Sequence, residues 1–140
     1  MKLLKIKTEE AGKVISLVAS TWQVITTMNI TEVNNDQSSF DYNAETGEIS
    51  ILRNGVYEFD GQITLENTDD ETPLVNIAIY VDGIFQFMCH SAVSWTKVFS
   101  SNSIPVLQGQ VITLKIMSPE TIDVQTTADQ HWLRIKRLYL

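Results

Sequence analysis

The sequence has little cysteine, proline or glycine, with one, three and six of these residues among 140. A single cysteine cannot close an internal disulfide, which excludes a small disulfide-stapled scaffold. Six glycines without a period exclude a collagen-like chain, and no Pro- or Gly-rich linker separates two halves. No apolar run approaches the roughly 20 residues that cross a bilayer, so we expect no membrane insertion. The length fits one domain.

Basic residues are also scarce, since 10 Lys and Arg stand against 17 Asp and Glu, giving a net charge of −7. They gather near the two ends of the chain. Between Val14 and Leu133, the only basic residues are Arg53, Lys97 and Lys115. An acidic body repels phosphates, so we expect no nucleic-acid partner.

Histidine is too rare for most catalytic or metal-bound sites, because the chain has only two. Cys89 and His90 are neighbours, and adjacent residues on a strand point to opposite faces, so they cannot form a Cys-His dyad. A jelly-roll enzyme of the cupin type needs a histidine-rich metal set. We therefore expect no enzyme, no catalytic residues and no cofactor.

An acidic loop over residues 67–72, NTDDET, offers oxygen ligands for a hard cation such as calcium. Asp69 to Glu71 lack the ligand spacing of an EF-hand, and solvated acidic loops are common. We interpret this segment as a solvated loop and predict no metal site.

Apolar and polar residues alternate with a period of two along most of the chain, which predicts an all-β protein. In VYEFDGQITL, Tyr57 and Phe59 fall on one face and Glu58 and Asp60 on the other. Further strands are expected at Trp22–Ile30, Lys97–Val106, Val111–Met117, Ile122–Thr126 and His131–Tyr139. The pattern fits a jelly-roll β-sandwich of about eight to ten antiparallel strands over residues 22–140. Residues 1–21 are expected to form an N-terminal arm or an extra hairpin around EEAG.

Asp82-Gly83 predicts a tight hairpin between LVNIAIYV and IFQFMCH. With a two-residue loop, Tyr80 faces Phe85, Ile79 faces Gln86 and Ala78 faces Phe87. Both faces of the hairpin are then apolar, and a sandwich covers only one of them. We expect a partner subunit to cover Tyr80, Phe85 and Phe87, with a loop or the N-terminal segment of the same chain as the alternative cover.

The segment FDYNAETGEISILRNGVYEF resembles the signature of the complement C1q globular head, in the tumour-necrosis-factor-like (TNF-like) jelly-roll superfamily. The matching residues are Phe40-Asp41, Thr46-Gly47, Gly55, Tyr57 and Phe59, with the two glycines 55 − 47 = 8 positions apart. The hairpin Val81-Asp82-Gly83 and the strand LQGQVITLKI are also similar to the family pattern. The resemblance covers about Trp22 to Leu140 and implies a trimeric, non-enzymatic recognition head.

The sequence shows no export signal, no collagen stalk and no extra cysteines, unlike vertebrate members of that family. These features favour a bacteriophage virion protein (fibre, baseplate or head decoration) with a structural or host-recognition role. Its expected partners are two further copies, other virion proteins or a host-surface glycan. The alternative is a soluble carbohydrate-binding module or a secreted C1q/TNF-like ligand, placed outside the cell or on a bacterial surface.

Trp95 is the candidate ligand-binding residue. It lies between two expected strands among small polar residues, in SAVSWTKVF, where an indole is placed to stack on a sugar face. The alternative is that Trp95 plugs the end of the sandwich.

Overall fold

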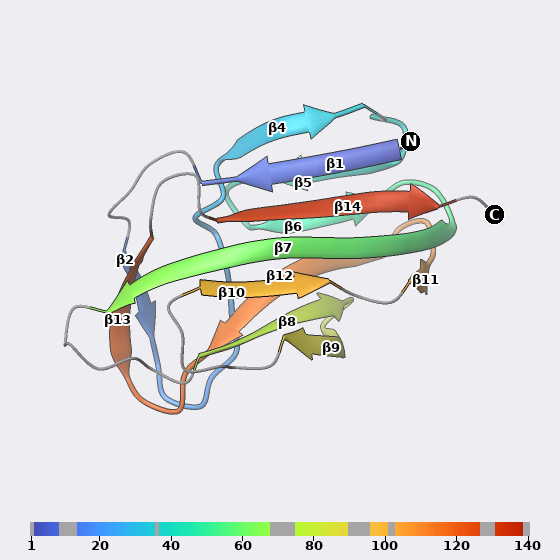
Figure 1. Ribbon diagram of the computed structural model, residues 1–140. Helices are drawn as coiled ribbons and strands as arrows, with labels where there is room; N and C mark the ends of the chain where they lie inside the picture. Colours follow the sequence, from blue (N-terminus) through green and yellow to red (C-terminus); the bar gives the residue numbers. More distant parts are fainter. Residues whose placement is uncertain are drawn as a thin grey trace.

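The computed structural model describes residues 2–8, 14–35, 37–67, 75–89, 96–100, 103–126 and 131–138. Their strands form two antiparallel sheets packed face to face (Figure 1). The larger sheet contains β1 (Lys2–Lys7), β2 (Val14–Leu17), β4 (Ile30–Asn34), β7 (Gly55–Asn67), β10 (Thr96–Ser100), β11 (Ile104–Val106), β13 (Ile122–Thr126) and β14 (Trp132–Leu138). The smaller sheet contains β3 (Gln23–Val24), β5 (Phe40–Asn43), β6 (Glu48–Ile51), β8 (Asn76–Val81), β9 (Ile84–Cys89) and β12 (Val111–Met117).

The all-β sandwich predicted from alternation is confirmed, and the strands expected at Val111–Met117 and Ile122–Thr126 have those bounds. The described residues hold more strands than expected because several are short. The strand expected over Trp22–Ile30 is wrong: only Gln23 and Val24 pair, and the next strand begins at Ile30. The segment expected over Lys97–Val106 divides into β10 and β11, which pair with different parts of β7.

The first two strands belong to the larger sheet instead of forming an arm or a separate hairpin. Strand β1 lies between β14 and β4, and β2 pairs with β13 at the far side of the same sheet. The apolar residues of β1 explain this placement, because Leu4 and Ile6 alternate with lysines and are buried in the common core.

The core lies between the sheets and takes alternate residues from β7. Tyr57, Phe59 and Ile63 are fully buried, whereas Glu58 and Asp60 point away from the core. No helix in the described part of the chain is long and apolar enough to cross a bilayer.

The Asp82-Gly83 hairpin is confirmed, but its expected register fails after the first two pairs. Tyr80 pairs with Phe85 as predicted, then an irregularity shifts the ladder, and Ile79 pairs with Phe87 instead of Gln86. The shift turns Phe87 to the core face, where its ring centroid lies 5.9 Å from that of Phe59. The prediction that Phe87 shares a face with Tyr80 and Phe85 is therefore wrong, because one extra residue in a strand reverses the faces that follow.

Tyr42, in β5, gives a pH-dependent prediction. Its hydroxyl donates a hydrogen bond to the Met28 carbonyl, and burial raises its pKa to about 12. The unfolded chain loses this proton first, near the ordinary pKa of 10, so the free energy of unfolding is expected to fall as pH rises from 10 through 12. Urea unfolding at several alkaline pH values measures this slope. Tyr42→Phe should make it shallower, and an unchanged slope contradicts the assignment.

Candidate functional site

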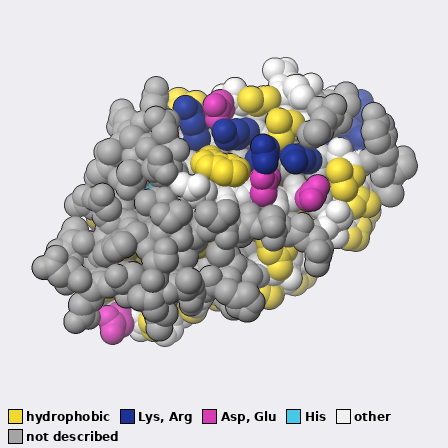
Figure 2. Space-filling model, viewed as in Figure 1, with side chains coloured by type: hydrophobic (Ala, Val, Ile, Leu, Met, Phe, Trp, Pro, Cys, Tyr) yellow, Lys and Arg dark blue, Asp and Glu magenta, His cyan; other side chains and the backbone are white. Residues whose placement is uncertain are grey.

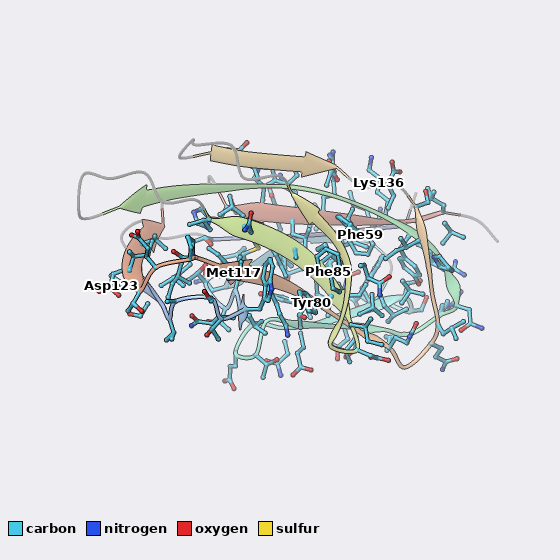
Figure 3. The ribbon with its side chains drawn as sticks, turned by 90° about the horizontal axis from the view of Figure 1, so that it is seen from below. Phe59, Tyr80, Phe85, Met117, Asp123 and Lys136 are labelled. Atoms are coloured by element: carbon cyan, nitrogen blue, oxygen red, sulfur yellow. The ribbon has the colours of Figure 1, made fainter. Side chains whose placement is uncertain are left out.

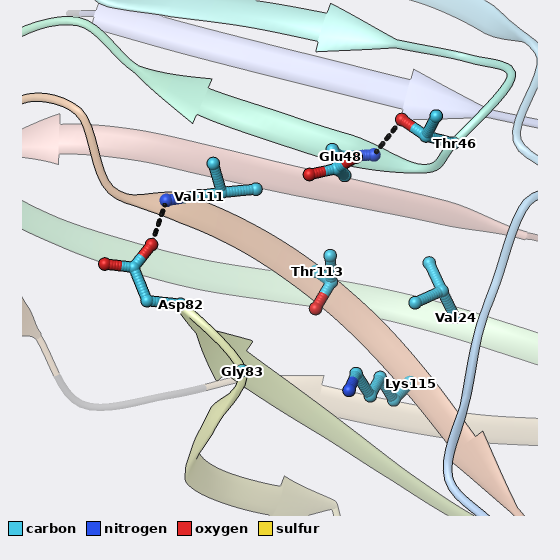
Figure 4. A pocket seen from close by; sticks show the side chains of 8 residues that line it. All are labelled: Val24, Thr46, Glu48, Asp82, Gly83, Val111, Thr113 and Lys115. Atoms are coloured by element: carbon cyan, nitrogen blue, oxygen red, sulfur yellow. Dashed lines mark hydrogen bonds between the residues drawn. The ribbon is translucent and has the colours of Figure 1, made fainter.

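A shallow pocket opens on the outer face of the smaller sheet (Figure 4). Its volume is about 500 Å³, and it is lined by Val24, Thr46, Glu48, Asp82, Gly83, Val111, Thr113 and Lys115. The lining comes from β3, the β5–β6 turn with the first residue of β6, the β8–β9 turn and β12. It brings carboxylates, hydroxyls and one ammonium group together beside two valines.

The β8–β9 turn holds one wall of this pocket in place. Asp82 has a positive φ of 49°, and its N–H donates to the Val111 carbonyl at 2.8 Å. Asp82 Oδ1 in turn accepts a hydrogen bond from the Val111 N–H, also at 2.8 Å. Gly83 has a φ of +75°, and a Cβ placed on it would meet no heavy atom within 4 Å, so this wall is open to a ligand.

The opposite wall is the β5–β6 turn. Asn43 caps this turn, because its side-chain oxygen accepts hydrogen bonds from the N–H groups of Glu45 and Thr46. The Thr46 hydroxyl accepts one from the Glu48 N–H at 3.3 Å. These local bonds set the direction in which Thr46 and Glu48 leave the backbone.

A row of aromatic rings lies beside the pocket. The ring centroid of Tyr80 is 5.8 Å from that of Trp22. It is 5.9 Å from that of Phe85, and Figure 3 labels both of these residues. Lys115 Nζ lies 4.3 Å from the Tyr80 ring centroid, which is a cation–π contact. Tyr80 is only 9% exposed, and burial raises the pKa of its hydroxyl. Trp22 belongs to the segment that follows β2. Tyr80 is therefore covered by its own chain, which was the alternative to cover by a partner subunit.

A second surface lies on the outer face of the larger sheet, over β1 and β14. Lysine and arginine side chains surround an apolar side chain there (Figure 2). Lys5 Nζ and Arg134 Cζ lie 5.3 Å and 5.6 Å from the Trp132 ring centroid. We call this surface, defined by Lys5, Trp132 and Arg134, the Trp132 face.

The charges of the Trp132 face are paired within the sheet. Lys5 and Arg134 are direct neighbours across β1 and β14, an arrangement that repels. Each has its own carboxylate: Lys5 Nζ is 2.9 Å from Glu32, and Arg134 donates from Nε to Asp60 at 3.0 Å. The hydrogen bond to Asp60 raises the pKa of Arg134.

Of the residues predicted to act together, Tyr80 and Phe85 lie side by side and Phe87 lies apart from them. Trp95 and His90 fall outside the described residues, as does the acidic loop from Asp69 to Glu71, so those expectations stay predictions. Among the described residues, no group of three or more His, Cys, Asp or Glu side chains is placed to hold a metal ion.

Sequence reasoning missed Trp22, Lys115 and the Trp132 face. Alternation in VITLKIM puts Thr113 and Lys115 on one face of β12, which was a usable signal for the part of the pocket that β12 lines. No local pattern could place Trp22 over Tyr80, because that contact joins segments far apart in the chain.

No protein-family model and no curated protein matches the chain. Several solved structures match the chain. Murine APRIL at pH 8.0 is 13% identical with a TM-score of 0.71, covering 98% of both chains. Rabbit GITRL is 15% identical with a TM-score of 0.62, covering 99% of this chain and 94% of its own.

Eiger TNF from S. frugiperda is 9% identical with a TM-score of 0.67, covering 98% of this chain and 92% of its own. At these identities the likeness concerns the fold alone. The two sheets are those of a TNF-like jelly roll over nearly the whole chain.

Proposed function

We propose that the protein is a homotrimeric, non-enzymatic ligand of the C1q/TNF-like type, which acts outside the cell by binding a partner. The observation that carries the proposal is the TNF-like fold over 98% of the chain. This likeness favours the ligand alternative over a bacteriophage virion protein, which has no support in these comparisons.

A ring of three copies needs two different surfaces on each chain, because the contact is heterologous. The β8–β9 hairpin offers the first. Strand β9 ends the path of the smaller sheet, and Ile84 and Phe85 are 66% and 47% exposed. Phe85 thus remains the leading residue of the predicted interface, while Tyr80 and Phe87 have most of their contacts within their own chain.

The Trp132 face offers the second surface. Burying a charge is costly unless it is paired, and Lys5 and Arg134 each have a carboxylate in the same sheet. The face can therefore meet a neighbouring copy without leaving Lys5 or Arg134 as an uncompensated cation. The indole of Trp132, half-buried between them, supplies apolar area at the centre.

Light scattering after gel filtration tests this assembly. The native chain at micromolar concentration should have three times its mass of 15.8 kDa. Phe85→Glu and Trp132→Glu should each give a folded monomer, because a carboxylate replaces apolar contact area at one of the two surfaces. Val18→Glu is the matched control, since Val18 is 57% exposed and belongs to neither surface. A monomeric native chain would overturn the proposal.

The expected glycan stacking at Trp95 also remains part of the proposal. Trp95→Ala should leave the trimer mass and the melting temperature unchanged and abolish adsorption to a glycan array. Unchanged adsorption by the folded variant would remove Trp95 from the site.

A further inference from the structure

We infer that the pocket on the outer face of the smaller sheet binds a neutral saccharide. The pocket adjoins the first surface proposed for the trimer, because Asp82 and Gly83 belong to the β8–β9 hairpin, but its lining residues include neither Phe85 nor Trp132. It also differs from the expected Trp95 site.

The first argument is the chemistry of the polar groups. A sugar presents hydroxyls that donate and accept at adjacent carbons, so its site needs both acceptors and donors within a few ångströms of each other. Glu48 and Asp82 provide carboxylate acceptors, Lys115 provides an ammonium donor, and Thr113 provides a hydroxyl that does both.

The second argument is that some of these groups have no protein partner to displace. In the part of the chain that the structure describes, no protein group hydrogen-bonds the Glu48 carboxylate or the Thr113 hydroxyl. Asp82 uses Oδ1 to hold Val111, which leaves Oδ2 for a ligand. A sugar hydroxyl can therefore bind without breaking the hydrogen bonds that build the walls.

The third argument is preorganisation. Asp82 is fixed by two hydrogen bonds to Val111, and Lys115 is positioned over the Tyr80 ring at 4.3 Å. Side chains held before binding lose less conformational entropy on binding. Val24 and Val111 add apolar surface for the C–H faces of a sugar ring.

The charge of the lining decides between ligand classes. Two carboxylates stand against one ammonium group, so an anionic sugar would meet net repulsion. An organic cation would be attracted by the carboxylates but repelled by Lys115, and it would leave Thr113 unused. A neutral polyol can use the polar groups of Glu48, Asp82, Thr113 and Lys115 together.

Amide chemical shifts of the native full chain test the inference directly. The probes are neutral oligosaccharides of glucose, galactose, mannose and N-acetylglucosamine, with polygalacturonate and choline as the charged competitors. At least one neutral oligosaccharide should shift the amides of Gly83, Thr113 and Lys115 with a Kd in the micromolar to millimolar range, and the charged probes should not.

Three variants make the test specific. Thr113→Val and Lys115→Met should each weaken that binding about tenfold, because a sugar hydroxyl loses its hydrogen-bond partner. Thr31→Val is the matched control, since Thr31 lines a different pocket. Unaltered binding by Thr113→Val and Lys115→Met, binding of choline or polygalacturonate alone, or no shift with any neutral probe would each overturn the inference. Chemical shifts report saccharide binding and light scattering reports the number of copies. Failure of this inference can therefore be distinguished from failure of the proposed trimer.

Discussion

Phe59→Ala is expected to lower the free energy of unfolding by about 3–5 kcal/mol, because it leaves a cavity where a fully buried ring lies between the sheets. Phe87→Ala should cost about half as much or more, since Phe87 is partly buried and packs against the same core. Phe85→Ala, by contrast, removes a half-exposed ring and should cost the monomer less than about 1 kcal/mol.

Urea unfolding of the three variants measures these differences, and a double-mutant cycle isolates the ring contact. Phe59 and Phe87 should show a coupling of about 0.5–1.5 kcal/mol, as expected for a tilted aromatic pair. Phe59 and Phe85 should show none. To keep loss of the trimer out of the comparison, all variants are made in the Trp132→Glu background. If Phe87→Ala costs no more than Phe85→Ala and shows no coupling to Phe59, the shifted register of the hairpin is wrong.

Gly47→Ala is expected to destabilise the protein by about 2–4 kcal/mol, from backbone strain and a steric clash together. The φ of Gly47 is +73°, and a Cβ there would lie 2.6 Å from the Ile25 carbonyl oxygen and 2.9 Å from Val24 Cγ1. A carbonyl oxygen of the backbone cannot rotate away as a flexible side chain can. The β5–β6 turn must therefore shift.

Gly83→Ala is the matched control for this prediction. Gly83 has nearly the same φ, +75°, but nothing lies within 4 Å of its Cβ position. It should lose only the about 1–2 kcal/mol of a left-handed alanine. Thermal unfolding of both variants measures the difference, and equal losses would show that the contact with Ile25 is not rigid. Gly47→Ala should also weaken saccharide binding, because Thr46 and Glu48 flank the displaced residue.

The β8–β9 hairpin shows how far local patterns reach. Asp82-Gly83 fixed the turn, and the first two cross-strand pairs followed from it, because a two-residue loop sets the register next to itself. The shift at the third pair depends on Phe87 finding space against Phe59. That space is made by β7, a strand that no local rule connects with the hairpin.

The Trp132 face likewise depends partly on a local pattern and partly on a contact between distant strands. Alternation put Lys5 and Arg134 on the solvent sides of their strands, but only the pairing of β1 with β14 made them neighbours around Trp132. The sandwich class, the core residues of β7 and most of the strands from β12 onward were determined by the sequence itself, since period-two burial is a local property. The order of strands, the cover over Tyr80 and the assembly of the pocket from separate segments were decided only by tertiary structure. These features depend on contacts between residues far apart in the chain, whose free energy does not appear in any local pattern.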